Sequence, residues 1–172
     1  MIKWSNIIKT LNNGVDILPN PDYWNLDTPG YNEILKSWKD ANYNFDAIKW
    51  TNYYPETHFP KLIEEDLSKQ LNIKPLRSWI SKIDPGYTAP WHWDVDDNEK
   101  EYLQQGTPVR YSIFIQDGLP GQVFMIDDQS YYSQKAGTII KWDNYKSWHA
   151  GANAGLSPKY MYHLIGIVNT YL

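Results

Sequence analysis

The sequence predicts a mainly β fold, with helices in the N-terminal part followed by a closed jelly-roll or cupin-like barrel. From Lys74 onward, short runs rich in β-branched and aromatic residues are separated by Gly, Pro, Asp and Asn. This pattern is typical of short strands joined by turns, and several such strands after a helical start favour a barrel with helices packed outside it. Aromatic residues make up 16% of the chain, which favours strands around a partly aromatic cavity over a helical bundle.

The chain has 172 residues, which suits one domain with a sizeable core. We expect a helical or loop-rich part over residues 1–73 and a jelly-roll core over residues 74–172. The spacing of apolar residues predicts a short helical turn at 6–11 and helices over 30–41 and 60–71. The strands that we expect cover residues 46–54, 76–83, 91–95, 109–115, 122–126, 137–142 and 159–168.

Composition excludes several classes of function. A formal charge of −4 without any Lys/Arg run argues against a nucleic-acid partner. The chain has no cysteine, so disulfides, thiolate metal sites and a Cys nucleophile are excluded. The N-terminus lacks the apolar segment of a secretory signal, and no stretch approaches the roughly 18 apolar residues of a membrane helix. We therefore expect a cytoplasmic protein with no membrane partner.

Two short segments carry the candidate chemistry, Trp91-His92-Trp93-Asp94 and Trp148-His149-Ala150-Gly151. A His and an Asp two positions apart on a strand point to the same face, and a second His from a distant strand can join them. Two imidazoles and one carboxylate with open coordination positions form the facial triad of non-heme Fe(II) oxygenases, although the same donors also suit Mn(II) or Zn(II). The predicted metal ligands are therefore His92, Asp94 and His149.

An oxygenase of this type needs an electron-donating co-substrate. A 2-oxo acid could chelate the metal at one end, and its far carboxylate would require a cation deep in the barrel. The chain has only two arginines, Arg77 and Arg110, and Lys159 opens the last long strand in a position that can face inward. Lys159 is the first candidate for this cation and Arg110 is the second.

A family resemblance emerges when these segments are read together. The sequence Pro85-Gly86, Pro90, His92-Trp93-Asp94, then Gly137-Thr138, Trp142, Trp148-His149-Ala150-Gly151 and Lys159-Tyr160 resembles the double-stranded β-helix of 2-oxoglutarate/Fe(II)-dependent oxygenases. The prolyl 4-hydroxylase-like branch is the most similar, over roughly residues 79–168. The resemblance implies catalytic metal ligation by His92, Asp94 and His149, and binding of the distal carboxylate of 2-oxoglutarate by Lys159. It also implies hydroxylation of a C–H bond with release of succinate and CO2, with ascorbate as a reductant.

The chain departs from this family on the strand before the H-x-D pair. Prolyl hydroxylases usually place a Tyr there against the co-substrate, whereas this chain has Lys82 and Ile83, so Tyr111 or Trp79 is expected to make that contact. Arg110 could instead hold an acidic substrate group, as aspartyl/asparaginyl hydroxylase-like relatives suggest.

The expected substrate is a peptidyl residue of the prolyl type or an amino-acid-like molecule. We expect the N-terminal half and the loop Asp96–Gly106 to select it. The tryptophans that flank the ligands, Trp91, Trp93 and Trp148, are expected to exclude water from the metal.

Other histidines and acids have simpler interpretations. His163 shares strand parity with Lys159 and is expected to be a hydrogen-bonded core histidine, whereas His58 is expected to be a non-catalytic loop residue. Asp96 and Asp97 are expected to be solvated, although either could be mistaken for the ligand if the strand register slips.

Two rival functions stay open at this point. One is a cupin-type metalloenzyme that does not use 2-oxoglutarate, and the other is a non-catalytic structural or carbohydrate-binding jelly roll. A demethylase of the alkylation-repair type is disfavoured, because that pattern uses arginines after the distal His and none follows His149.

Overall fold

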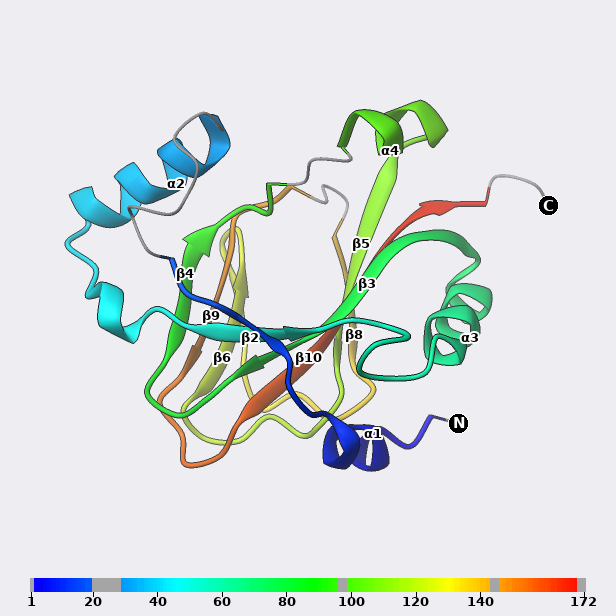
Figure 1. The fold of residues 1–172 in the computed structure, drawn as a ribbon, viewed down its shortest axis with the longest axis horizontal. Helices are drawn as coiled ribbons and strands as arrows, with labels where there is room; N and C mark the ends of the chain where they lie inside the picture. The colour runs from blue at the N-terminus through cyan, green and yellow to red at the C-terminus, as the bar shows by residue number, and fades with distance from the viewer. Residues whose placement is uncertain (1, 20–28, 96–98, 143–145, 170–172) are drawn as a thin grey trace.

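Two antiparallel sheets form the body of the protein (Figure 1). The computed structural model describes residues 2–19, 29–95, 99–142 and 146–169. The larger sheet has six strands in the order β1 (Val15–Ile17), β2 (Trp50–Tyr53), β3 (Ile73–Ile83), β10 (Lys159–Val168), β5 (Pro108–Phe114) and β8 (Ile139–Trp142). The smaller sheet has four, in the order β4 (Thr88–His92), β9 (His149–Asn153), β6 (Gln122–Ile126) and β7 (Gln129–Tyr131). From β3 onward the chain alternates between the two sheets, except that β6 and β7 form a hairpin within the smaller sheet. This is the arrangement of a double-stranded β-helix, which confirms the predicted fold class.

Strand periodicity in the larger sheet separates an inner face from an outer face. On β10, Lys159 and His163 point toward the smaller sheet and line the cavity between the sheets, whereas Tyr162 and Leu164 belong to the core on the other side. Every residue of β5 is buried, because one face of this strand borders the cavity and the other is covered by helices. A strand buried on both faces lacks the alternating pattern of a half-exposed strand.

Helices α1 (Trp4–Thr10) and α3 (Leu62–Leu71) cover the outer face of the larger sheet. In α3, Ile63 and Leu67 enter the core beside Tyr162 and Leu164. The helix stops at Asn72, which has a left-handed conformation with φ 51°, as is common at helix C-termini.

Helix α2 (Pro29–Asp40) packs at the end of β4, away from the other helices (Figure 1). Ile34, Leu35 and Trp38 are its buried side chains. The Trp38 indole donates a hydrogen bond of 2.6 Å to the carbonyl of Trp91, which ties the helix to β4 one residue before His92.

Several elements differ from the sequence prediction. Strands β1, β7 and β9 were not expected as separate elements, and α4 (Glu99–Gln105) lies where a loop was predicted. Strand β4 ends at His92, so Asp94 belongs to the segment after the strand and not to the strand itself.

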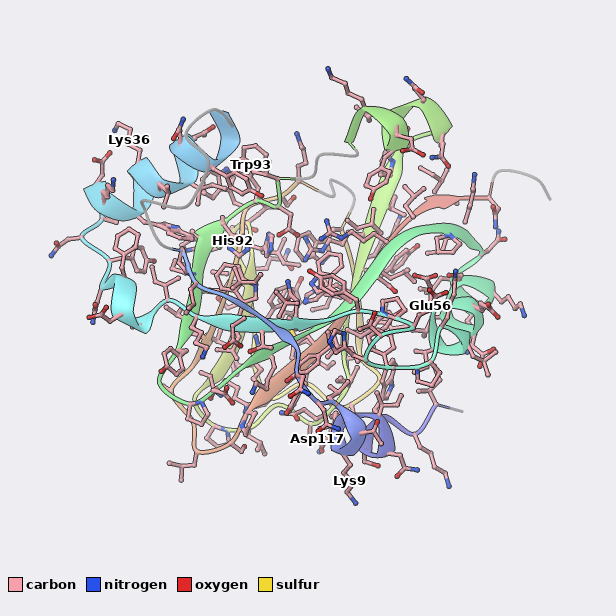
Figure 2. All side chains as sticks on the ribbon, in the orientation of Figure 1. Lys9, Lys36, Glu56, His92, Trp93 and Asp117 are labelled. Atoms are coloured by element: carbon pink, nitrogen blue, oxygen red, sulfur yellow. The ribbon has the colours of Figure 1, made fainter. Side chains whose placement is uncertain are left out.

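The charged side chains labelled in Figure 2, such as Lys9, Lys36 and Glu56, lie at the periphery, whereas His92 lies inside the molecule. Within the part of the chain that the structure describes, no helix combines the length and apolar character needed to cross a membrane.

Candidate metal centre

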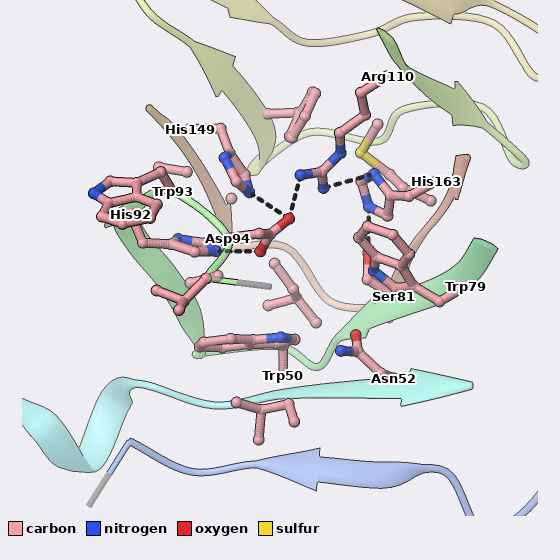
Figure 3. A pocket seen from close by; sticks show the side chains of 18 of the residues that line it. Trp50, Asn52, Trp79, Ser81, His92, Trp93, Asp94, Arg110, His149 and His163 are labelled. Carbon is pink, nitrogen blue, oxygen red and sulfur yellow. Dashed lines mark hydrogen bonds and ion pairs between the residues drawn. The ribbon is translucent and has the colours of Figure 1, made fainter. Parts of the chain in front are cut away.

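Three predicted ligands converge at one end of the cavity between the sheets. Antiparallel pairing of β4 with β9 sets His92 directly opposite His149, and their ring centroids are 4.2 Å apart. The Asp94 carboxylate completes the group: Nε2 of His92 is 3.7 Å from Oδ1, and Nε2 of His149 is 3.9 Å from Oδ2. One ligand atom from each residue lies within 4.8 Å of the others (Figure 3).

Backbone carbonyls orient both imidazoles toward this point. The Nδ1 atom of His92 donates to the carbonyl of Pro90 at 2.6 Å, and Nδ1 of His149 donates to the carbonyl of Ser147 at 3.1 Å. These bonds leave Nε2 of each ring as the atom that faces Asp94. Such outer contacts select the tautomer and fix the ring orientation in metal sites.

The charge states of the three side chains suit a divalent cation. Burial lowers the pKa of His92 and holds the pKa of His149 well below its ordinary value, so both rings are neutral at pH 7. Burial acts to raise the pKa of Asp94, but the positive charge of Arg110 opposes it, and this pKa stays below its ordinary value. Neutral imidazoles beside an ionised carboxylate are the forms in which these residues bind metals, so this donor set fits Fe(II), Mn(II) or Zn(II).

Arg110 holds the carboxylate of Asp94 in place. Its guanidinium forms an ion pair with Oδ2 of Asp94, while Oδ1 is the oxygen nearer to His92. The guanidinium carbon lies 4.8 Å from the ring centroid of Trp79 and 4.0 Å from that of Trp142. Asp94 follows the end of β4, so strand pairing does not fix its position. The ion pair with Arg110 fixes this third candidate ligand instead.

His163 contacts the Arg110 guanidinium on the side away from Asp94 (Figure 3). Nδ1 of His163 lies 3.3 Å from the Arg110 guanidinium and 2.9 Å from the Ser112 hydroxyl, and Nε2 lies 2.9 Å from the Ser81 hydroxyl. The ring also stacks on Trp79. His163 is therefore a hydrogen-bonded core histidine facing the cavity, as predicted from strand parity.

The cavity has a volume of about 460 Å³, which lies in the usual range for small-molecule sites. Trp50 stacks on the His92 ring with a centroid distance of 5.4 Å and is one of several aromatic lining residues. Of the three tryptophans expected to exclude water, Trp93 lines the cavity. Trp148 instead packs with the α2 core, and Trp91 is not among the described lining residues.

Lys159 lies in the same cavity, close to β9 and β6. Its Nζ atom is 5.2 Å from the Phe124 ring centroid, and it would lie only 3.2 Å from the Cβ of any larger residue at Gly151. Burial lowers the pKa of Lys159 to about 7. Among the described residues no carboxylate forms a salt bridge with this ammonium, which leaves the site suited to an anionic ligand.

The expected role of Tyr111 is wrong. Strand parity places Tyr111 on the outer face of β5, because its neighbour Arg110 faces the cavity, and Tyr111 packs in the core under the helices. Trp79, the alternative for that contact, does line the cavity. His58 bonds to the backbone of Tyr54 and Asn13, outside the cavity, as expected.

The rival ligands Asp96 and Asp97 lie outside the described residues. Sequence reasoning did not assign a site role to Trp50 and Asn52 on β2 or to Arg77 on β3, all of which line the cavity. Arg77 could have been found, because it has the same strand parity as Trp79 and Ser81.

No family model and no curated protein sequence matches the chain. Among solved structures, the viral collagen prolyl hydroxylase of Paramecium bursaria Chlorella virus-1, in a 2-oxoglutarate complex, is 14% identical with a TM-score of 0.47, covering 80% of this chain and 89% of that one. A predicted oxalate decarboxylase from Thermotoga maritima is 14% identical with a TM-score of 0.40, covering 69% and 81%. A cupin domain of an XRE-family transcriptional regulator from Enterobacter cloacae is 12% identical with a TM-score of 0.39, covering 59% and 87%. Similarities at this level do not bear on the activity of this chain.

Proposed function

We propose that this protein is a 2-oxoglutarate- and Fe(II)-dependent oxygenase that hydroxylates a C–H bond of a peptidyl or amino-acid-like substrate. One observation carries the proposal: His92, Asp94 and His149 meet in a cavity that also contains the buried Lys159. In the overall reaction, R–H, O2 and 2-oxoglutarate give R–OH, succinate and CO2. One oxygen atom of O2 enters the alcohol and the other enters succinate.

In this proposal the protein holds the metal and shields it from water. Nε2 of His92, Nε2 of His149 and the Asp94 carboxylate would hold Fe(II), which supplies the chelation of the 2-oxo acid and the activation of O2 when bound. Trp50 covers one face of the His92 ring, so the ligand is shielded on that side. Arg110 keeps the carboxylate ionised and restricts its rotation.

Lys159 is our candidate for binding the distal carboxylate of 2-oxoglutarate. The choice over Arg110 rests on charge, because the Arg110 guanidinium is already paired with Asp94. An ammonium buried beside Phe124 gains more from a bound carboxylate than a solvated one does, since the low local dielectric strengthens the ion pair.

The test is a succinate-release assay with Fe(II), 2-oxoglutarate and ascorbate, run with and without peptide and metabolite pools. His149→Ala should abolish Fe(II) binding and 2-oxoglutarate decarboxylation. His58→Ala, which changes a histidine outside the cavity, is the matched control and should retain both. Full decarboxylation by His149→Ala would refute the metal assignment.

The co-substrate assignment is tested separately. Lys159→Ala should raise the 2-oxoglutarate concentration needed for half-maximal turnover more than about tenfold, because hydrogen bonds to charged groups contribute about 1.5–3 kcal/mol. If Arg110→Ala has this effect and Lys159→Ala does not, the assignment to Lys159 is wrong. Metal binding without any 2-oxoglutarate turnover would instead support a cupin-type metalloenzyme.

A further inference from the structure

The charged side chains that the structure describes along the cavity are mostly cationic. Among the described lining residues, Arg77, Arg110 and Lys159 carry positive charge and Asp94 is the only carboxylate. Under the proposed function, a metal dication and a 2-oxoglutarate dianion would cancel each other and leave the charge balance of these described residues unchanged. A cavity of this kind favours a further anionic group on whatever molecule fills its remaining space.

Arg77 lies far from the proposed co-substrate site. On β3 the side chains of Arg77, Trp79, Ser81 and Ile83 all line the cavity. Lys159 pairs with Ile83 at one end of this row, whereas Arg77 lies at the other. At the rise of a strand, the two Cα positions are roughly 20 Å apart, so Arg77 and Lys159 lie at opposite ends of this row.

Arg77 and Arg110 flank the same indole. The Arg77 guanidinium carbon lies 5.2 Å from the Trp79 ring centroid, and that of Arg110 lies 4.8 Å from it. A guanidinium placed over an aromatic ring keeps its N–H donors in its own plane, where a carboxylate can accept two parallel hydrogen bonds. With five donors, Arg77 can bind a carboxylate while keeping another contact.

Asn52 provides a second polar group in this cavity. It pairs with Ser81 of β3 and lies beside Trp50 in Figure 3, and its buried Oδ1 atom has no hydrogen-bond partner among the described residues. A buried acceptor without a partner loses its hydration and gains nothing in return. A ligand that donates an N–H to this atom would satisfy it, as an amino group does.

We infer that Arg77 is the carboxylate-binding residue for the primary substrate, and that this substrate is an amino-acid-sized acid. The inference rests on the proposed function for the reaction, but the binding step can be tested on its own. The hydroxylated C–H bond would belong to the part of the acid that reaches from Arg77 toward His92 and His149, past Trp50 and Trp79.

The experiment measures binding by ligand-observed NMR with protein loaded with Zn(II) and 2-oxoglutarate, which does not turn over. The probes are the free amino acids, their carboxamides, and short peptides with free or amidated C-termini. The variants are Arg77→Gln, the charge-preserving Arg77→Lys, and Lys82→Gln. Lys82 is the matched control, because it is a cation on the same strand that pairs with Asp84 outside the cavity.

The expected result is that one or more free amino acids bind and their carboxamides bind at least about tenfold more weakly. Arg77→Gln should lose this preference, Arg77→Lys should keep part of it, and Lys82→Gln should behave as wild type. Binding of C-terminally free peptides, but not of single amino acids, would leave the carboxylate site in place but overturn the size inferred for the substrate.

Three results would overturn the inference. They are equal binding of acids and amides, no binding of any acid, and an unchanged preference for acids in Arg77→Gln. A parallel succinate assay keeps the two proposals apart. Arg77→Gln should lose the stimulation of succinate release by the acid that binds, whereas Lys82→Gln should keep this stimulation. If the wild type shows no decarboxylation while acid-selective binding persists, the proposed reaction fails and the carboxylate site stands.

Discussion

The ion pair between Arg110 and Asp94 makes a quantitative prediction for metal-free protein. Arg110→Met keeps an aliphatic side chain between Trp79 and Trp142 but removes the charge that faces Asp94. The Arg110 side chain is 2% exposed and that of Asp94 is 31% exposed. Breaking a fully buried pair costs 3–5 kcal/mol. Because Asp94 is partly hydrated, we expect a smaller loss of about 2 kcal/mol at neutral pH, or about 4–8 °C in Tm.

The pH dependence of this loss distinguishes an electrostatic cause from a packing defect. In the wild type the pKa of Asp94 is lowered, so its stabilising contribution is present above the pKa of an unfolded carboxyl and is lost only as the pH falls toward the folded value. In Arg110→Met, burial should raise this pKa above the unfolded value. The loss of unfolding free energy in the variant is then complete at neutral pH. It becomes smaller as acid protonates Asp94 or a neighbouring imidazole.

The assay is urea unfolding of EDTA-treated wild type and variant between about pH 5 and pH 7.5. Lys82→Met is the control, since its partly exposed pair with Asp84 should contribute less than about 1 kcal/mol. A deficit for Arg110→Met that stays constant across this range, or no deficit at neutral pH, would refute the electrostatic reasoning.

Two further predictions concern the co-substrate and the α2 contact. Because burial lowers the pKa of Lys159 to about 7, the affinity of Mn(II)-loaded protein for 2-oxoglutarate should fall as the pH rises above 7, by up to about tenfold per pH unit. Calorimetry should show weaker, nearly pH-independent binding for Lys159→Met, and a wild-type affinity that is constant up to pH 9 would contradict this role. Trp38→Phe removes the hydrogen bond to the Trp91 carbonyl and should cost about 1 kcal/mol in urea unfolding, so a variant as stable as wild type would show that this bond does not anchor α2.

Elements with a strong local pattern were predictable from the sequence. The helical spacing in residues 30–41 and 60–71 corresponds to α2 and α3, and β6 and β10 have the predicted bounds. The strands that were missed lack such a pattern. Strands β1 and β7 have three residues each, which is too few to show a period, and β9 contains His149-Ala-Gly-Ala-Asn with no β-branched residue. Pairing with neighbouring strands therefore stabilises β9 despite its low intrinsic β propensity.

Part of the candidate site was likewise predictable from the sequence, and part was not. The donor types and their order were visible in His92, Asp94 and His149, whose convergence the structure shows. The error on Tyr111 arose because adjacent strand residues face opposite sides, and on a strand buried on both sides the sequence does not say which side faces the cavity. The packing of α1 and α3 against one face of the sheet decides it.

The sequence by itself determined the chemical character of this protein: a cysteine-free, mainly β fold with two imidazoles and a carboxylate as candidate metal donors, and few cations to serve an anionic ligand. Tertiary structure decided how those cations are used. Arg110 forms an ion pair with Asp94, and Lys159 lies apart from it near Phe124. Arg77 and Arg110 both lie near the Trp79 ring. The physical reason is that these contacts depend on the register between strands distant in the chain, and a shift of one residue would turn each side chain to the opposite face of the sheet.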